Sequence, residues 1–230
     1  MGQLEEKVWA RFDKKLFLLY YNNEQEFIIM QVLKQEVKQK IKKAAISEFE
    51  QNGYQKTSMR SIASSAGVTV GNLYRYFKNK DDLFNVIIQP AFQEIYKFID
   101  EFARFEKSTL SEEKQKEDFI KTFEESLIRI YIQHRPELVI LLNGSKGSQM
   151  ENAREQIISL IAGRIKKEAF PRMKKKRIMA EDNFLAQVLA TSFIEGISLV
   201  LNKYKDKEKT KELFTQFTHI YFRNLLNELI

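Results

Sequence analysis

One short segment of the chain brings small polar residues and two arginines together. The run Val70-Gly71-Asn72 would let the backbone and short side chains of a helix start approach base edges in a DNA major groove. Arg60 and Arg75 are candidates to bind guanine or a phosphate, and the alternative is that each is a solvated surface charge. The chemistry that this segment favours is binding to a nucleic acid.

Thr57 and Ser58 add two hydroxyl groups just before Arg60. Each could donate a hydrogen bond to a phosphate oxygen. Each could equally cap the helix that begins beside it, because Ser and Thr oxygens accept hydrogen bonds from the free N–H groups of a helix start. The sequence leaves both roles open.

The sequence lacks the side-chain combinations that catalysis or metal binding needs. The chain has no Cys and only two His, His134 and His219. We find no nucleophile with a base, no Gly-rich phosphate loop and no set of residues with metal-ligand spacing. We therefore expect no enzyme activity, no metal and no cofactor.

The positive charge of the chain is concentrated in one stretch. The net charge is +7, and residues 31–85 hold ten Lys or Arg against five Asp or Glu. The rest of the 230-residue chain is close to neutral. A polyanion such as DNA is therefore expected to meet this stretch.

The elements that would position these residues are short helices. Apolar residues at helical spacing predict a helix over 38–52, ended by Gly53, and a second over 59–66, ended by Gly67. Thr69 can cap a third helix over 70–77, on which Leu73 and Phe77 should face inward. Two short helices joined in this way form a helix-turn-helix.

The remaining chain continues in the same Gly-poor helical pattern. Asn79 can cap a fourth helix, which Pro90 is expected to kink or split. We find no credible strand, so the predicted fold class is all-α. The later helices are predicted at 112–133, 136–143, 149–170, 178–204 and 210–229.

Residues 41–83 resemble the N-terminal DNA-binding domain of the TetR family of bacterial transcriptional regulators. The match runs without a gap through Ile41, Ala44-Ala45, Phe49 and Gly53, then Thr57-Ser58-Met59-Arg60-Ser61-Ile62-Ala63, then Ala66-Gly67-Val68-Thr69-Val70-Gly71-Asn72-Leu73-Tyr74-Arg75-Tyr76-Phe77-Lys78-Asn79-Lys80-Asp81-Asp82-Leu83. Together with the residues above, the resemblance implies that Tyr74, Tyr76 and Lys80 contact phosphates. The full set of expected DNA contacts is Thr57, Ser58, Arg60, Thr69, Val70, Gly71, Asn72, Tyr74, Arg75, Tyr76 and Lys80.

The resemblance divides the chain into three parts. These are an N-terminal extension over 1–35 that we expect to be helical, a DNA-binding domain over 36–83, and a regulatory domain over 84–230. From Phe84 onward the resemblance is architectural, because the family's regulatory domains are divergent helical bundles that hold a small-molecule pocket and the dimer interface.

Two sets of residues are candidates for those regulatory roles. A pocket would take Phe119, Phe123, Leu127 and Tyr131 at helical spacing, with Tyr131 and Gln187 as polar groups, and the alternative is ordinary core packing. The apolar composition favours an apolar effector of unknown identity. A four-helix homodimer interface would use the last two helices through Ala190, Gly196, Ser198, Phe214, Phe217, Tyr221 and Leu225.

Three segments fit the resemblance less closely. The aromatic extension is expected to form an added helix packed on the body, although Met30 would give a conventional start. The basic run 164–177 is interpreted as a solvated loop, with a second nucleic-acid patch as the alternative. Residues 184–201 are interpreted as a buried helix and not a membrane span, and no secretory signal opens the chain.

Taken together, these features predict a cytoplasmic, homodimeric regulator that binds double-stranded operator DNA. Repression relieved by a small molecule follows from the resemblance and from no single residue. The alternative is an architectural or nucleoid-associated DNA-binding protein that has no small-molecule effector.

Overall fold

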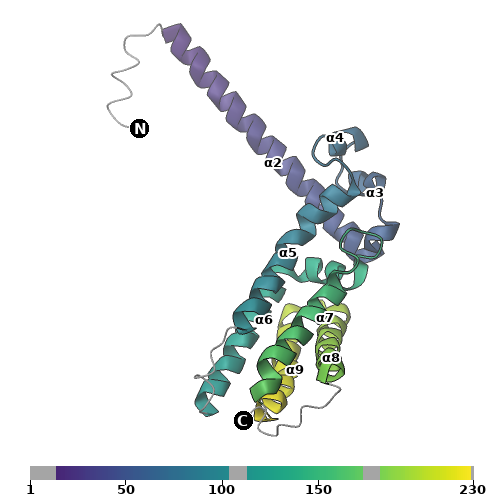
Figure 1. The fold of residues 1–230 in the computed structure, drawn as a ribbon. Helices are drawn as coiled ribbons and strands as arrows, with labels where there is room; N and C mark the ends of the chain where they lie inside the picture. Colours follow the sequence, from purple (N-terminus) through teal and green to yellow (C-terminus); the bar gives the residue numbers. More distant parts are fainter. Residues whose placement is uncertain (1–13, 104–112, 173–181, 229–230) are drawn as a thin grey trace.

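The computed structural model describes residues 14–103, 113–172 and 182–228, and these residues form helices and turns without any strand (Figure 1). The all-α fold predicted from the sequence is confirmed. Residues 1–13 of the extension and 173–177 of the basic run lie outside the described residues. Below, "head" denotes residues 36–83 and "body" denotes residues 84–230.

Helix α2 (Lys14–Lys56) joins the extension to the head (Figure 1). Its helical geometry is interrupted at Gly53, where the sequence predicted a helix end, with φ at 70° and ψ at 168°. Ile41, Ala45 and Phe49 are fully buried and recur every four residues, so they fix the C-terminal part of α2 in the head core. The N-terminal part was expected to pack on the body, and this prediction is wrong. It projects away, and residues 31–36 are exposed.

Helices α3 (Met59–Ser65) and α4 (Val70–Tyr74) form the helix-turn-helix. The turn between them uses Gly67, whose φ of 65° places it in the left-handed region. The predicted cap at Thr69 is confirmed, because its Oγ1 accepts from the Asn72 N–H at 3.1 Å. Helix α4 ends three residues earlier than the predicted Phe77.

Helix α5 (Lys80–Ala103) carries the chain from the head into the body. Asn79 caps it as predicted, with its Oδ1 accepting from the Asp82 N–H at 2.8 Å. The expected split at Pro90 is wrong, because α5 runs through this residue as one helix. The head and the body therefore share a continuous helix.

The body is a bundle of helices packed around an apolar core (Figure 1). The predicted break near Pro136 is confirmed, because α6 (Glu113–Val139) consists of two helical stretches joined across a kink at His134, whose φ of −129° and ψ of 22° are not helical. The chain then continues into the π-helix η1 (Ile140–Gly144). Helix α6 packs on α9 and α7 packs on α8. The remaining elements are α7 (Ala153–Arg164), the π-helix η2 (Ile165–Ala169), the 3-10 turn η3 (Phe170–Arg172), α8 (Asp182–Lys203) and α9 (Lys207–Glu228).

The described part of the basic run is helical rather than a loop. Arg164 donates to Asp100 of α5 at 2.5 Å, while Lys166 and Lys167 are exposed on η2. Residues 164–172 of the segment that was interpreted as a solvated loop are therefore helical, in the end of α7, η2 and η3.

Candidate nucleic-acid interface and regulatory cavity

Helix α4 presents one face to solvent and anchors the other in the head core. Leu73 is fully buried and Phe77 is 2% exposed, so both face inward as predicted. Tyr74, in contrast, is 50% exposed. The other expected contacts on or beside α4 are exposed or half-buried, namely Thr69, Val70, Gly71, Asn72, Arg75 and Tyr76.

The start of α4 is open enough to approach a large partner. A side chain at Gly71 would meet no atom within 4 Å. The backbone N–H of Asn72 donates to the Thr69 cap, so the side-chain amide of Asn72 can still bind a base edge. The helix start thus has the geometry that reading a major groove requires.

The structure separates the roles of the two hydroxyls before α3. Ser58 is the N-cap, because its Oγ accepts from the Ser61 N–H at 3.0 Å while its own N–H donates to Ser61 Oγ. Thr57 is 3% exposed, and its Oγ1 donates to the carbonyls of Gly53 at 2.8 Å and Glu48 at 3.1 Å. Thr57 as a DNA contact is therefore wrong, because its hydroxyl is buried in the head. Ser58 and Arg60 stay exposed on the surface.

Lys80 is bound to the end of α2. Its Nζ donates to the carbonyls of Tyr54 and Thr57, both at 2.9 Å, and lies 4.0 Å from the centre of the Tyr54 ring. Burial lowers the pKa of this ammonium, and the negative charge of Asp81 acts against that shift. Since an ammonium has three donors, one remains for the phosphate contact, which stays a prediction.

Tyr54 links the same corner to α5. Its hydroxyl donates to Asp81 Oδ1 at 2.8 Å, and its ring packs edge-on against Phe84 at 4.9 Å. Burial raises the pKa of the Tyr54 phenol to about 12, with further contributions from the hydrogen bond to Asp81 and from its charge. Sequence reasoning missed this residue, whose only signal was an aromatic next to the helix-ending Gly53.

The body encloses an apolar cavity of about 60 Å³ between its helices. Leu127 and Tyr131 line it as predicted, whereas Phe119 and Phe123 are buried but do not line it. Gln187 as a pocket group is wrong, because it is exposed on α8. The other lining residues are Ile95, Phe98, Ile99, Ile130, Leu138, Leu142, Ile157, Ile161, Phe193, Ile194, Ile197 and Phe214.

Tyr131 supplies the one hydroxyl in this lining. The residue is 1% exposed, and its oxygen has no hydrogen-bond partner among the described residues. No charged side chain lines the cavity. A ligand here would therefore meet apolar walls, and the buried Tyr131 hydroxyl carries a free-energy cost while it stays unpaired.

The residues predicted to form a dimer interface pack within the chain instead. Phe217 stacks on Phe193 at 5.7 Å and occupies the space over Gly196, and the Tyr221 hydroxyl donates to the Leu189 carbonyl at 2.6 Å. Ala190, Ser198 and Phe214 are also buried, and the side chain of Leu225 lies outside those described. The face of α8 that was predicted to meet a second protomer therefore packs on α9 of the same chain. Gly196, Phe217 and Tyr221 remain partly exposed there, so the predicted interface stays a prediction.

The opposite face of this helix pair is apolar and exposed. Phe184 is 70% exposed and Leu199 is 68% exposed on α8, and Ile220 is 65% exposed on α9. Leu185 and Val188 add to the α8 stripe. By length and composition α8 could also cross a membrane, but 39% of its most apolar window is buried in the fold, so it is a core helix on one side.

Arg135 ties the head to the body. Its guanidinium donates to Glu50 Oε1 of α2 at 2.7 Å and to the Leu201 carbonyl of α8 at 3.3 Å. The backbones of Gly53 and Gly144 also meet here, since a Cβ on Gly53 would lie 3.5 Å from the Gly144 oxygen. A shift of α6 or α8 would therefore reach the first helix of the head directly.

Comparison with known proteins identifies the head. Residues 41–87 match the family described as bacterial regulatory proteins, tetR family. This chain carries the TetR-family domain. Over 60 residues the chain is 40% identical to the probable acrEF/envCD operon repressor of Escherichia coli K12, which covers 25% of this chain and 27% of that protein. The regulator AcrR of Shigella flexneri is 47% identical over 53 residues, or 23% of this chain and 25% of AcrR.

The chain thus aligns with about a quarter of the length of these curated relatives. A solved structure extends the likeness to the body. The MbdR regulator of Azoarcus sp. CIB superposes with a TM-score of 0.58 at 21% identity, covering 84% of this chain and 99% of MbdR. At this identity the superposition shows the shared fold, an all-α body behind a helix-turn-helix head.

Proposed function

We propose that the protein is a sequence-specific DNA-binding transcriptional regulator that represses its target. The observation that carries this function is α4, whose start is exposed and open while Leu73 and Phe77 fix it to the head. The concentration of positive charge in residues 31–85 supports a polyanionic partner. Repression is favoured because a relative of the TetR-family domain is described as an operon repressor.

A small molecule bound in the body would relieve repression. The cavity has room for about two water molecules, so an effector of ordinary size needs the lining helices to move apart. The absence of charge in the lining favours a neutral, apolar effector that pairs with the Tyr131 hydroxyl. Coupling is then the difference in DNA affinity between two states, typically about 1 to 3 kcal/mol.

The functional unit is a homodimer in the cytoplasm, joined through the exposed stripe of α8 and α9. Phe184, Leu199 and Ile220 are large apolar side chains left in water by the single chain. A twofold-symmetric dimer would bury them and place two heads one DNA turn apart, about 34 to 36 Å. The expected operator is a pseudo-palindrome.

Selection from a pool of random DNA duplexes tests this function. The full chain is expected to enrich one pseudo-palindromic sequence at 0.15 M salt, and that duplex should outcompete random DNA by about a thousand-fold or more. Leu73→Ala, which loosens α4, is the negative control. Equal affinity for all duplexes would contradict the proposal and favour an architectural DNA-binding protein.

A further inference from the structure

The extension of α2 and helix α4 enclose a groove of about 580 Å³ on the surface of the head. Three of its lining residues are expected DNA contacts from α4 and the turn after it, and four come from the projecting part of α2. The lining is Gln31, Leu33, Lys34, Val37, Asn72, Arg75 and Tyr76.

The polar groups along this groove are suited to a phosphodiester. Lys34 and Arg75 are exposed cations, one on each wall, and no carboxylate lines the groove. The amides of Gln31 and Asn72 and the hydroxyl of Tyr76 add neutral donors. Ammonium, guanidinium, amide and hydroxyl groups are the side chains that bind DNA phosphates.

The walls of the groove are held in place from below. Lys38 is half-buried one turn after Lys34, with its ammonium 5.9 Å from the centre of the Phe77 ring. Phe77 is the residue that anchors the end of the α4 segment in the core. The contact between Lys38 and Phe77 therefore helps to hold α2 next to the segment that follows α4, beneath the groove.

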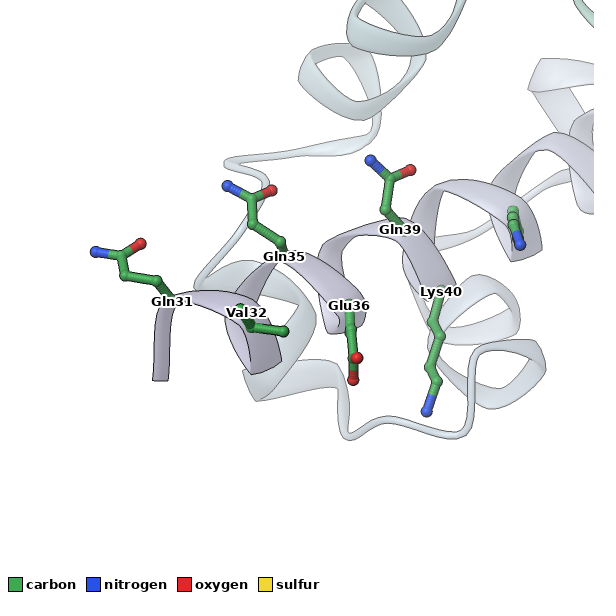
Figure 2. A pocket seen from close by; sticks show the side chains of 7 residues that line it. Gln31, Val32, Gln35, Glu36, Gln39 and Lys40 are labelled. Carbon is green, nitrogen blue, oxygen red and sulfur yellow. The ribbon is translucent and has the colours of Figure 1, made fainter. Parts of the chain in front are cut away.

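The opposite face of the same helix has a different character (Figure 2). Figure 2 shows Gln31, Gln35 and Gln39 pointing to one side of α2 and Glu36 and Lys40 pointing to the other, and Gln31 also lines the groove. Every residue lining this shallow hollow belongs to α2, so no second wall faces it among the described residues. Lys34 and Lys40 are thus exposed lysines on one helix, and of the two only Lys34 lines the groove.

We propose that the groove between α2 and α4 holds the sugar-phosphate backbone of the DNA strand whose bases α4 reads. This inference rests on the proposed function and adds a second point of attachment to it. Because Asn72 and Arg75 belong both to the reading helix segment and to the groove, a strand that passes α4 continues between the two walls. The footprint then extends past the major groove on the side of the extension.

Paired lysine variants of the full chain test the groove. The measurements are the affinity for the selected operator duplex as a function of salt, by fluorescence anisotropy, and hydroxyl-radical footprinting of the same duplex. Lys34→Ala is the test variant and Lys40→Ala is its matched control, since each removes one exposed positive charge from α2. Thermal melting checks that both variants fold.

Lys34→Ala should reduce the slope of log affinity against log salt by about 0.9, the change for one lost phosphate contact, and weaken binding roughly three- to ten-fold at 0.15 M salt. It should also lose protection at the flank of the footprint. Lys40→Ala should change neither, because Lys40 does not line the groove, and its position lies about 9 Å along the helix from Lys34 while charges are screened within about 8 Å at this salt. If the two variants have equal slopes and footprints while the wild type still binds the operator, the proposal that the groove holds the DNA backbone is contradicted, and the proposed function is not. Loss of specific binding by the wild type would overturn the proposed function as well.

Discussion

Tyr54 in the head and Tyr131 in the body are both buried tyrosines, yet their hydroxyls have different surroundings. The Tyr54 hydroxyl donates to Asp81 at 2.8 Å, whereas the Tyr131 hydroxyl has no partner among the described residues. The head pairs its buried polar groups with each other and keeps its DNA-reading groups exposed. The body leaves a buried polar group unpaired beside a cavity. A rigid surface for DNA therefore requires that buried polar groups be hydrogen-bonded. A site that opens for a ligand can contain a buried polar group that is not.

The largest expected effect separates anchoring from reading within α4. Leu73→Ala should lower the free energy of unfolding by about 2 to 5 kcal/mol, because it leaves a cavity in the head core. Tyr74→Ala, at the exposed neighbour, should change stability by less than about 0.5 kcal/mol while weakening DNA binding. Chemical denaturation and anisotropy measure the two effects. A stable Leu73→Ala variant would show that α4 is not anchored as described.

The next effect concerns the two faces of α8. Leu199→Glu should weaken dimerisation by about 100-fold or more, since it places an unpaired charge in the proposed interface. Phe217→Glu, on the inner face, should instead unfold the body. Light scattering at micromolar concentration and thermal melting distinguish these outcomes. A Leu199→Glu variant that remains a dimer would remove the exposed stripe from the interface.

The same substitution at the two tyrosines should have opposite signs. Tyr54→Phe keeps the ring against Phe84 but removes the hydrogen bond to Asp81, so stability should fall by about 1.5 to 3 kcal/mol. Tyr131→Phe removes an unpaired hydroxyl, so stability should stay the same or rise by about 1 kcal/mol. Urea denaturation compares them directly. Equal losses at both positions would break the contrast between head and body.

Asn72 should affect specificity more than stability. Asn72→Ala is expected to weaken operator binding by about 1 to 3 kcal/mol and to relax the preference at one base position, because an asparagine amide can pair with adenine. Affinity for random DNA should barely change. An equal loss on operator and random duplexes would assign Asn72 to the phosphate contacts.

The smallest effect is the response of the head to alkaline pH. The raised pKa of Tyr54, about 12, favours the neutral phenol in the folded state over the unfolded value near 10. Its contribution to stability is therefore complete below pH 10 and is lost as the pH rises from 10 to 12. Melting temperature across this range should fall less in Tyr54→Phe than in wild type. Parallel curves would show that Tyr54 is not coupled to folding in this way.

The sequence predicted the head well because its signals are local. The caps at Thr69 and Asn79 and the left-handed Gly67 each depend on residues within one turn. Thr57 and Ser58 could not be told apart, since both are good caps and only the packing of α2 decides which hydroxyl is buried. Contacts between distant segments, such as Tyr54 with Asp81, left no local pattern.

The body was harder to predict because apolar residues surround its last helices. Phe193 and Leu199 lie on the same helix and are equally apolar, but one packs inside the chain and the other lies in water. Composition cannot say which side of α8 meets α9, and so most of the residues assigned to the interface pack within the chain. The break predicted near Pro136, in contrast, is present at His134, because proline is a local signal.

The size of the cavity also sets how much effector a cell must accumulate before the protein responds. If the proposed effector is larger than the cavity of about 60 Å³, only molecules whose lining helices have moved apart can bind it. If about 1% of molecules are open, the apparent dissociation constant is about 100 times the intrinsic one. Tightening the apolar lining would raise this dose threshold, and loosening it would lower the threshold, without any change in the predicted DNA contacts.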